Sequence, residues 1–241
     1  MILELDLGNT RGKWRILAGA DIVARGASDI APWLAGDVPR EWMGVERVRI
    51  ASVREQALEQ ALQAVLASLN APVQFARPQA VCAGVTNAYT QIERLGVDRW
   101  LAMLAAYNEF RSAVLVLQAG SALTLDLIDG QGLHRGGYII PGARLMAQAL
   151  LSSTDRVRFE QADMLASTAP GCVTDTCVQN GIALALVGAA QLGLVQARAT
   201  LGSVRLVTAG GDAEALHRLL AEDGLSWRPD LVLDGLRWAL P

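Results

Sequence analysis

The stretch Leu3-Glu-Leu-Asp-Leu-Gly-Asn-Thr10 decides the fold of this chain, and a related stretch, Leu115-Val-Leu-Gln-Ala-Gly-Ser-Ala122, follows it. Each is an apolar strand that runs into a glycine turn and is followed by a second strand-like run. Glycine lets the backbone approach a ligand and lets successive N–H groups converge on an anion, so each unit can cradle a phosphate. The pair predicts two stacked halves with a nucleotide between them. The alternative is two unrelated hairpins that share a glycine.

Two charged residues flank the first turn in a way that suits a metal-bound phosphate. The Asp6 carboxylate can hold a hydrated Mg²⁺ ion, since Mg²⁺ keeps its waters and takes few protein ligands. Lys13 is the only lysine among the 21 basic residues of the chain. A compact ammonium on a flexible stem suits a phosphate oxygen better than a planar guanidinium does. The alternative is that Lys13 is an ordinary surface lysine.

A third glycine turn occurs near the C-terminus, in the stretch Leu206–Ala213. The Gly210-Gly211 pair at a strand-to-helix junction lets a flat nucleoside lie on the backbone, although glycine often ends a strand for packing reasons alone. Following two phosphate-type turns, the stretch resembles the adenosine motif of the superfamily that includes acetate kinase, sugar kinases, Hsp70 and actin. That resemblance implies an α/β fold of two duplicated ribonuclease H-like halves, each a mixed sheet flanked by helices.

Composition excludes several classes of protein. The net charge of −3 and the pI of about 5.4 argue against a nucleic-acid partner, which usually requires a basic face. No uninterrupted apolar run approaches the ~18 residues of a membrane span. Glu4 and Asp6 stand where a signal peptide would be basic and then apolar, so we expect a cytoplasmic protein without a membrane segment. The cysteines Cys82, Cys172 and Cys177 form no CxxC pair and are interpreted as reduced thiols.

At 241 residues the chain can form one large domain or two. The duplication favours two, residues 1–111 and residues 112–241. Residues 77–97 are rich in turn-forming residues and are a good place for a site. The apolar helix expected at Thr176–Val195 requires burial on several sides, which a dimer interface would supply. Strands are expected at Ile2–Asp6, Lys13–Leu17, Ile22–Ala24, Arg47–Ala51, Val73–Ala76, Ala113–Leu117, Leu123–Ile128, Leu133–Ile140 and Val204–Val207, and helices at 54–69, Asp98–Phe110, 143–152, 175–197 and Ala213–Ala221.

Taken together, the motifs resemble type III pantothenate kinase over almost the whole chain. The most specific part is Gly96-Val-Asp-Arg99, which with Asn87-Ala-Tyr89 resembles the substrate segment of that family. The other matching parts are Asp6-Leu-Gly-Asn-Thr10 with Lys13, Gly120-Ser-Ala-x-Thr124-x-Asp126, His134-x-Gly-Gly137-x-Ile-x-Pro-Gly142, Thr174 with Gly181, Thr208–Ala213 and Pro229–Leu236.

The resemblance implies an ATP-dependent phosphorylation of pantothenate in a homodimer, with Mg²⁺ or another divalent cation. Asp98 would be the general base or positioner for the primary hydroxyl of pantothenate. Thr174 would reach the substrate site from the partner subunit. The implied substrate-binding residues are Tyr89, Gly96, Val97, Asp98, Arg99 and Thr174, and the implied ATP-binding residues are Asp6, Leu7, Gly8, Asn9, Thr10, Arg11, Gly12, Lys13 and Ser121.

Three positions depart from the family pattern: Ile92 stands where a proline is common, Ser121 replaces a usual threonine but keeps a hydroxyl, and Gln118 is the departure that matters most. Gln118 stands where the family usually has a carboxylate associated with a bound K⁺ or NH₄⁺ ion, and an amide supplies no charge there. The alternative function is therefore a non-enzymatic or weakly active protein like the Bvg accessory factor. A sugar or acetate kinase is a third reading, although those chains are usually much longer. On spacing alone, Asp98 could instead serve only to cap the helix that follows it.

Overall fold

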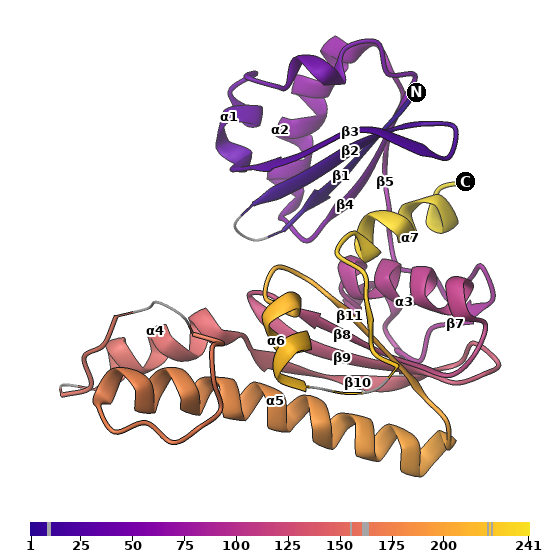
Figure 1. Cartoon of the computed structure of the whole chain (residues 1–241). Helices are drawn as coiled ribbons and strands as arrows, with labels where there is room; N and C mark the ends of the chain where they lie inside the picture. The colour runs from indigo at the N-terminus through magenta and orange to yellow at the C-terminus, as the bar shows by residue number, and fades with distance from the viewer. Residues whose placement is uncertain (9–10, 155, 161–163, 221, 223) are drawn as a thin grey trace. The chain divides into compact units, whose positions relative to one another are not determined.

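The computed structural model describes residues 1–8, 11–154, 156–160, 164–220, 222 and 224–241. Within this part of the chain, two five-stranded sheets have the same strand order (Figure 1). The first is ordered β3-β2-β1-β4-β5 and the second β10-β9-β8-β11-β12. In each sheet the first three strands are antiparallel, while the last two run parallel to the first strand. The predicted duplication of a mixed sheet is therefore confirmed.

The first sheet has an apolar face and a charged face because its strands alternate. Leu3, Leu5 and Leu7 of β1 are fully buried in a core that also contains Trp33 and Leu62. Helices α1 and α2 supply the last two residues and so cover this face. The elements are β1 (Ile2–Leu7), β2 (Gly12–Ala18), β3 (Asp21–Ser28), α1 (Ile30–Leu34), η1 (Arg40–Trp42), β4 (Arg47–Ser52), α2 (Gln56–Leu66), η2 (Ala67–Leu69) and β5 (Val73–Phe75).

The second sheet buries one face under three helices. Leu115 and Leu117 of β8 and Leu123 and Leu125 of β9 form a core with side chains of α4, α5 and α6. The elements are β8 (Val114–Ala119), β9 (Ala122–Ile128), β10 (His134–Pro141), α4 (Ala143–Ser153), α5 (Thr174–Leu201), β11 (Arg205–Ala209), α6 (Ala213–Leu220) and β12 (Ser226–Trp227). Between the two sheets in sequence lie β6 (Val81–Cys82), β7 (Val85–Thr86), η3 (Ile92–Arg94) and α3 (Val97–Phe110).

The sequence interpretation assigned no element to the short segments η1, β6, β7 and η3. It also assigned none to three further segments. These are α1, which contains Pro32, the two-residue strand β12, and the C-terminal helix α7 (Leu231–Ala239). Proline inside a five-residue helix and a strand of two residues leave no periodic signal. The α7 sequence is amphipathic, so its signal was present and was missed.

The chain forms two compact units that are each discontinuous in sequence. Unit 1 contains Met1–Ala83, Tyr89–Ala105 and Val232–Pro241, and unit 2 contains Gly84–Ala88 and Ala106–Leu231. The chain therefore passes from one unit to the other inside α3 and at the start of α7. The division into residues 1–111 and 112–241 follows the duplicated motifs, and it stays a prediction.

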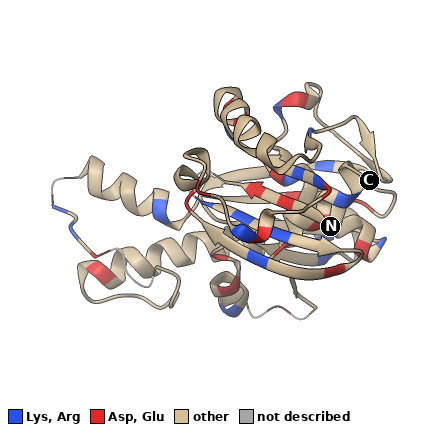
Figure 2. Ribbon diagram, turned by 90° about the horizontal axis from the view of Figure 1, so that it is seen from above, with Lys and Arg blue, Asp and Glu red and all other residues tan. Residues whose placement is uncertain are grey.

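Helix α5 is long and apolar. Its only charged residues are Asp175 and Arg198, so it is nearly free of colour in Figure 2. By length and composition it could cross a membrane, and it is the one such helix in the described part of the chain. The apolar helix expected at Thr176–Val195 lies within α5, but its interrupted apolar pattern contains no run as long as a membrane span. Only 39% of its most apolar window is buried.

Candidate active site

The first glycine turn joins β1 to β2 in unit 1. The Gly8 N–H donates to the carbonyl of Arg11 at 3.1 Å and closes the turn. A Cβ at Gly12 would overlap the ring of Trp33, so only glycine fits where β2 begins against α1. Asn9 and Thr10, two of the expected ATP-binding residues, lie outside the described residues. Leu7 is fully buried and Arg11 is exposed, so within this loop their side chains face core and solvent respectively.

Asp6 and Lys13 lie next to this turn on neighbouring strands. They are direct partners in the antiparallel register of β1 and β2, so their side chains share one face of the sheet. That face is opposite to the one occupied by Leu5 and Leu7. Both side chains are partly exposed. A carboxylate and an ammonium therefore stand side by side at the mouth of the turn, as the sequence predicts for a metal-bound phosphate.

The second turn, from Gln118 to Ala122, meets two other glycine motifs in unit 2. The Gly142 N–H donates to the Ser121 carbonyl at 3.0 Å, and Gly142 is the N-cap of α4. The Asp212 N–H donates to the Ala119 carbonyl at 3.1 Å. Gly210 has φ +100°, and any Cβ there would overlap the Ala119 backbone. The predicted phosphate and adenosine motifs of this half are therefore in direct contact.

A pocket of about 350 Å³ opens where these motifs meet. Arg144 from α4 and Asp212 at the start of α6 bring opposite charges to its wall. Burial raises the pKa of the Asp212 carboxyl, and the positive charge of Arg144 offsets part of that rise. Sequence reasoning missed Arg144, whose position two residues after the Pro141-Gly142 pair gave no separate signal. The remaining lining residues are Ala143, Met164, Leu165, Ala166, Gly211, Ala215 and Arg218.

The expected substrate segment gathers around the start of α3. The Arg99 guanidinium donates to the Tyr89 hydroxyl at 2.8 Å and lies 5.7 Å from the centre of the Tyr89 ring. Arg99 is 4% exposed, whereas Asp98 is only partly buried. Asp98 Oδ1 accepts a hydrogen bond of 2.8 Å from the Arg99 backbone N–H.

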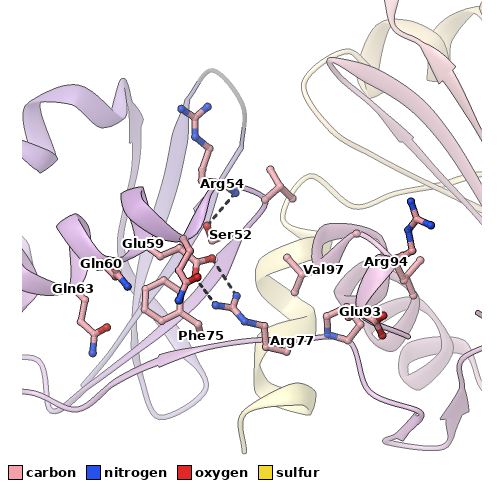
Figure 3. A pocket seen from close by; sticks show the side chains of 15 residues that line it. Ser52, Arg54, Glu59, Gln60, Gln63, Phe75, Arg77, Glu93, Arg94 and Val97 are labelled. Atoms are coloured by element: carbon pink, nitrogen blue, oxygen red, sulfur yellow. Dashed lines mark hydrogen bonds and ion pairs between the residues drawn. The ribbon is translucent and has the colours of Figure 1, made fainter. Parts of the chain in front are cut away.

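Gly96 and Val97 also line a polar pocket of about 740 Å³ in unit 1 (Figure 3). Arg54, Arg77 and Arg94 are among its lining residues. Figure 3 shows Arg77 turned toward Glu59, with which it forms an ion pair. A pocket with this lining suits a polar or anionic small molecule. Its other lining residues are Ser52, Val53, Gln56, Gln60, Gln63, Phe75, Pro78, Glu93 and Leu95.

Two further expected site residues are Thr174 and Gln118. Thr174 is the first residue of α5 and is exposed. Gln118 is paired in register with Thr124 across β8 and β9, so their side chains share one face of the second sheet. Gln118 Oε1 and Thr124 Oγ1 are both buried, and neither has a hydrogen-bond partner in the described part of the chain. They are neutral oxygens, the ligand type that K⁺ accepts in place of water.

Among the described residues, acidic and nitrogen ligands do not cluster as they do in a dedicated metal cage. Over the described ranges there is no group of three or more His, Cys, Asp or Glu side chains that could hold a metal ion. A single carboxylate such as Asp6 is nevertheless sufficient for Mg²⁺ that arrives with a nucleotide, because phosphate oxygens and water complete its shell. Buried His134 lies 3.1 Å from Asp126 and joins β10 to β9 instead.

Comparisons with known proteins identify the family of this chain. Residues 2–196 match the family model described as Type III pantothenate kinase. A type III pantothenate kinase of Pseudomonas aeruginosa (strain LESB58) is 39% identical over 250 residues, covering 100% of this chain and 99% of that protein. One from Ectopseudomonas mendocina (strain ymp) is 37% identical over 248 residues, with 100% and 99% coverage.

Solved structures show the same fold. A Campylobacter jejuni protein provisionally named as a Baf family transcriptional activator has a TM-score of 0.64 and 20% identity, covering 98% of this chain and 95% of that one. A Sinorhizobium meliloti protein provisionally named as a 2-dehydro-3-deoxygalactonokinase has a TM-score of 0.55 and 13% identity, covering 98% and 97%. At these identities the likeness concerns the fold alone.

Proposed function

The chain belongs to the type III pantothenate kinase family, and we propose that it transfers the γ-phosphate of ATP to the primary hydroxyl of pantothenate. The product is 4'-phosphopantothenate, and the reaction is the first step of coenzyme A synthesis. The observation that carries the proposal is the Tyr89–Arg99 pair beside Asp98, because the family's most specific motif forms one cluster in the structure. A protein that only bound ligands would not need a carboxylate in this cluster.

Phosphoryl transfer depends mostly on positioning and on neutralising charge. The Gly8 and Gly120 turns offer backbone N–H groups to the phosphates, and Ser121 adds a hydroxyl. Lys13 supplies a positive charge beside the γ-phosphate. Asp6 would hold Mg²⁺, which when bound neutralises phosphate charge. We assign residues 6–13 and Ser121 to ATP on this basis.

Asp98 acts on the acceptor. An alcohol has a pKa far above 7, so a carboxylate within hydrogen-bond reach can orient the hydroxyl and accept its proton as the new bond forms. Asp98 lies in the first turn of α3, where the helix dipole favours the ionised carboxylate. Arg99, held by Tyr89, brings a fixed positive charge that suits the carboxylate of pantothenate. Gly96 and Val97 complete the acceptor side.

Gln118 and Thr124 would hold a monovalent cation through neutral oxygens. Such an ion would add positive charge near the second phosphate loop, residues 118–122. Because neither ligand is charged, the ion would be held more weakly than beside a carboxylate. We therefore propose that K⁺ or NH₄⁺ assists this protein little.

A second copy of the chain is the proposed partner of α5. Leu184, Leu192 and Val195 are 58%, 61% and 58% exposed along one side of this helix. Gly188 lies on the same side with open space where a Cβ would stand. An apolar stripe of this kind suits a homodimer, in which Thr174 would reach the partner's acceptor site. We place the dimer in the cytoplasm, where both substrates occur.

The test is an ATP-dependent assay of the purified protein with pantothenate, against a panel of sugars and short organic acids. Phosphorylation of pantothenate alone supports the proposal. Phosphorylation of a sugar or a short acid would instead indicate another kinase of the same fold. No phosphorylation of any acceptor, together with normal folding, would favour a non-enzymatic accessory protein.

A further inference from the structure

A row of charged side chains crosses the first sheet beneath the phosphate-binding turn. In the registers of β1 with β2 and with β4, Glu4 is the direct partner of both Arg15 and Arg49. These three residues therefore share the face of the sheet opposite to the Leu3, Leu5 and Leu7 core. Figure 2 shows blue and red segments side by side in these strands.

The row is buried and consists of ionisable side chains only. Glu4 is 0% exposed, Arg15 5% and Arg49 6%. Glu4 Oε2 accepts from Arg15 Nε at 2.7 Å, and Glu4 Oε1 accepts from Arg49 Nη1 at 3.3 Å. The carboxylate is thus held from both sides by two strands. Burying such a group is costly unless its partners are held in place, so the geometry of the row is strongly constrained.

Arg15 also reaches the C-terminal helix. Its Nη1 donates to Asp234 Oδ1 of α7 at 2.6 Å, a contact between residues 219 positions apart. Burial alone would lower the pKa of Arg15, but Glu4 and Asp234 reverse this effect, and the pKa is raised. Two carboxylates therefore balance two guanidinium groups. Asp234 itself is only partly buried, with 34% of its side chain exposed.

The row lies one step behind the residues that meet the phosphates. Asp6 lies two positions after Glu4 in β1, and its partner Lys13 lies two positions before Arg15 in β2, on the same face of the sheet. At the usual strand rise, this pair is about 7 Å from the row. A shift of β1 against β2 that broke the Glu4–Arg15 contact would move Asp6 against Lys13 by the same amount. Because interiors are densely packed, such shifts are transmitted rather than absorbed.

The fourth member of the network lies near a boundary between the units. The last segment of unit 1 begins at Val232, two residues before Asp234. The C-terminal segment, α7 and the two residues after it, contacts the rest of unit 1 at two further points. The Cys82 thiol donates to the Trp238 carbonyl at 3.3 Å, and the Arg47 guanidinium donates to the Pro241 carbonyl at 2.6 Å.

From this arrangement we propose that Glu4, Arg15, Arg49 and Asp234 form a positioning network for phosphoryl transfer. The Arg15–Glu4–Arg49 row fixes the spacing of Asp6 and Lys13. The Arg15–Asp234 contact makes that spacing depend on how α7 packs in unit 1. None of the four residues touches a substrate. The inference rests on the proposed role of Asp6 and Lys13 in holding Mg-ATP.

The test begins with Asp234→Asn, because this partly exposed position tolerates a neutral side chain of the same size. Arg15 keeps its contact with Glu4, so the protein stays folded. We expect KM for ATP to rise and kcat to fall, each by roughly three- to tenfold, while KM for pantothenate stays unchanged. Titration calorimetry with Mg-AMPPNP should show the same loss of nucleotide affinity without turnover. Asp234→Glu should keep most of the normal kinetic constants and of the normal affinity for Mg-AMPPNP.

Two comparisons separate positioning from general stability. Glu46→Gln removes an ion pair of 3.2 Å with the N-terminus at the opposite end of the same sheet, and should leave all kinetic constants unchanged. Arg15→Lys gives a compact donor that cannot reach both carboxylates, so it should weaken nucleotide binding as Asp234→Asn does. The double variant should lose no more nucleotide affinity than the more strongly affected single variant, since both changes break the same contact.

Several outcomes would overturn the inference. One is an Asp234→Asn protein that binds Mg-AMPPNP as well as the unmodified protein does. Another is a loss of thermal stability with unchanged kinetics, or additive effects of Asp234→Asn and Arg15→Lys. An unmodified protein that binds no Mg-AMPPNP would instead contradict the proposed function itself, so the two failures are distinguishable.

Discussion

Replacing Asp98 with asparagine is the most direct test of the proposed chemistry. The change keeps the size of the side chain and keeps Oδ1, which accepts the Arg99 backbone N–H at 2.8 Å. It removes the negative charge and with it the capacity to accept a proton from the substrate. General-base catalysis contributes about 10²–10⁴-fold to a rate, so we expect kcat to fall by ~10²-fold or more.

The expected effect on stability is much smaller than the effect on rate. A 10²-fold loss of kcat corresponds to about 2.7 kcal/mol in the barrier, at about 1.36 kcal/mol per factor of ten. Loss of a negative charge in the first turn of a helix costs about 0.3–1 kcal/mol. For a chain of this size, that cost lowers Tm by only about 1–4 °C.

The assay is steady-state turnover of pantothenate at saturating Mg-ATP, with Tm measured on the same samples. Asp37→Asn is the matched control, because it removes an exposed carboxylate of unit 1 that takes no part in the proposed site. It should leave kcat unchanged. An Asp98→Asn protein with kcat within a few-fold of normal would leave Asp98 as a helix-capping residue and remove it from the mechanism.

Four further predictions concern separate features. Lys13→Arg should lower kcat/KM for ATP by roughly tenfold, because a planar fork does not replace a point donor in a tight turn; equal kinetics would make the lone lysine incidental. Initial rates should depend little on KCl at fixed ionic strength, and Gln118→Asp should create that dependence; a strong K⁺ requirement in the unmodified protein would contradict this. Light scattering should detect a dimer, whose interface we expect to bury about 2,000 Å² or more in total. Leu192→Glu should give monomers, and an unmodified protein that is monomeric and active would refute the interface. Burial raises the pKa of the Asp212 carboxyl, so the folded protein loses stability as the pH rises from the usual aspartate pKa through the raised one. Asp212→Asn should therefore raise Tm at pH 7 but not near pH 3, and an equal gain in Tm at both pH values would contradict this cause.

Much of the architecture could be predicted because the two glycine turns repeat. Each turn implies a strand before it and a returning strand after it, and both sheets were found with the same strand order. Helix α3 was expected from Asp98 and begins one residue earlier, at Val97. Apart from the amphipathic helix α7, the elements that escaped prediction are short or irregular, as in α1 with its internal Pro32. Their existence depends on tertiary contacts such as that between Trp33 and Gly12, which no local pattern reveals.

The candidate site was predicted unevenly, for a physical reason. Tyr89, Asp98 and Arg99 lie close together in sequence and carry a specific motif, so their contact could be expected. Arg144 could not be connected with Asp212, because 68 residues separate them and their proximity depends on how α4 and α6 meet the second sheet.

The charged row of the first sheet shows the same limit more sharply. The alternation of β1 predicts that Glu4 and Asp6 share a face, but alternation alone places Glu4 on a face that could equally be solvated. Burial of Glu4 follows only from the register that sets Arg15 and Arg49 on either side of it and from the helix that brings Asp234. Register and helix docking are long-range properties of this fold. A residue that positions others through such contacts therefore carries no motif of its own, and only the assembled sheet identifies it.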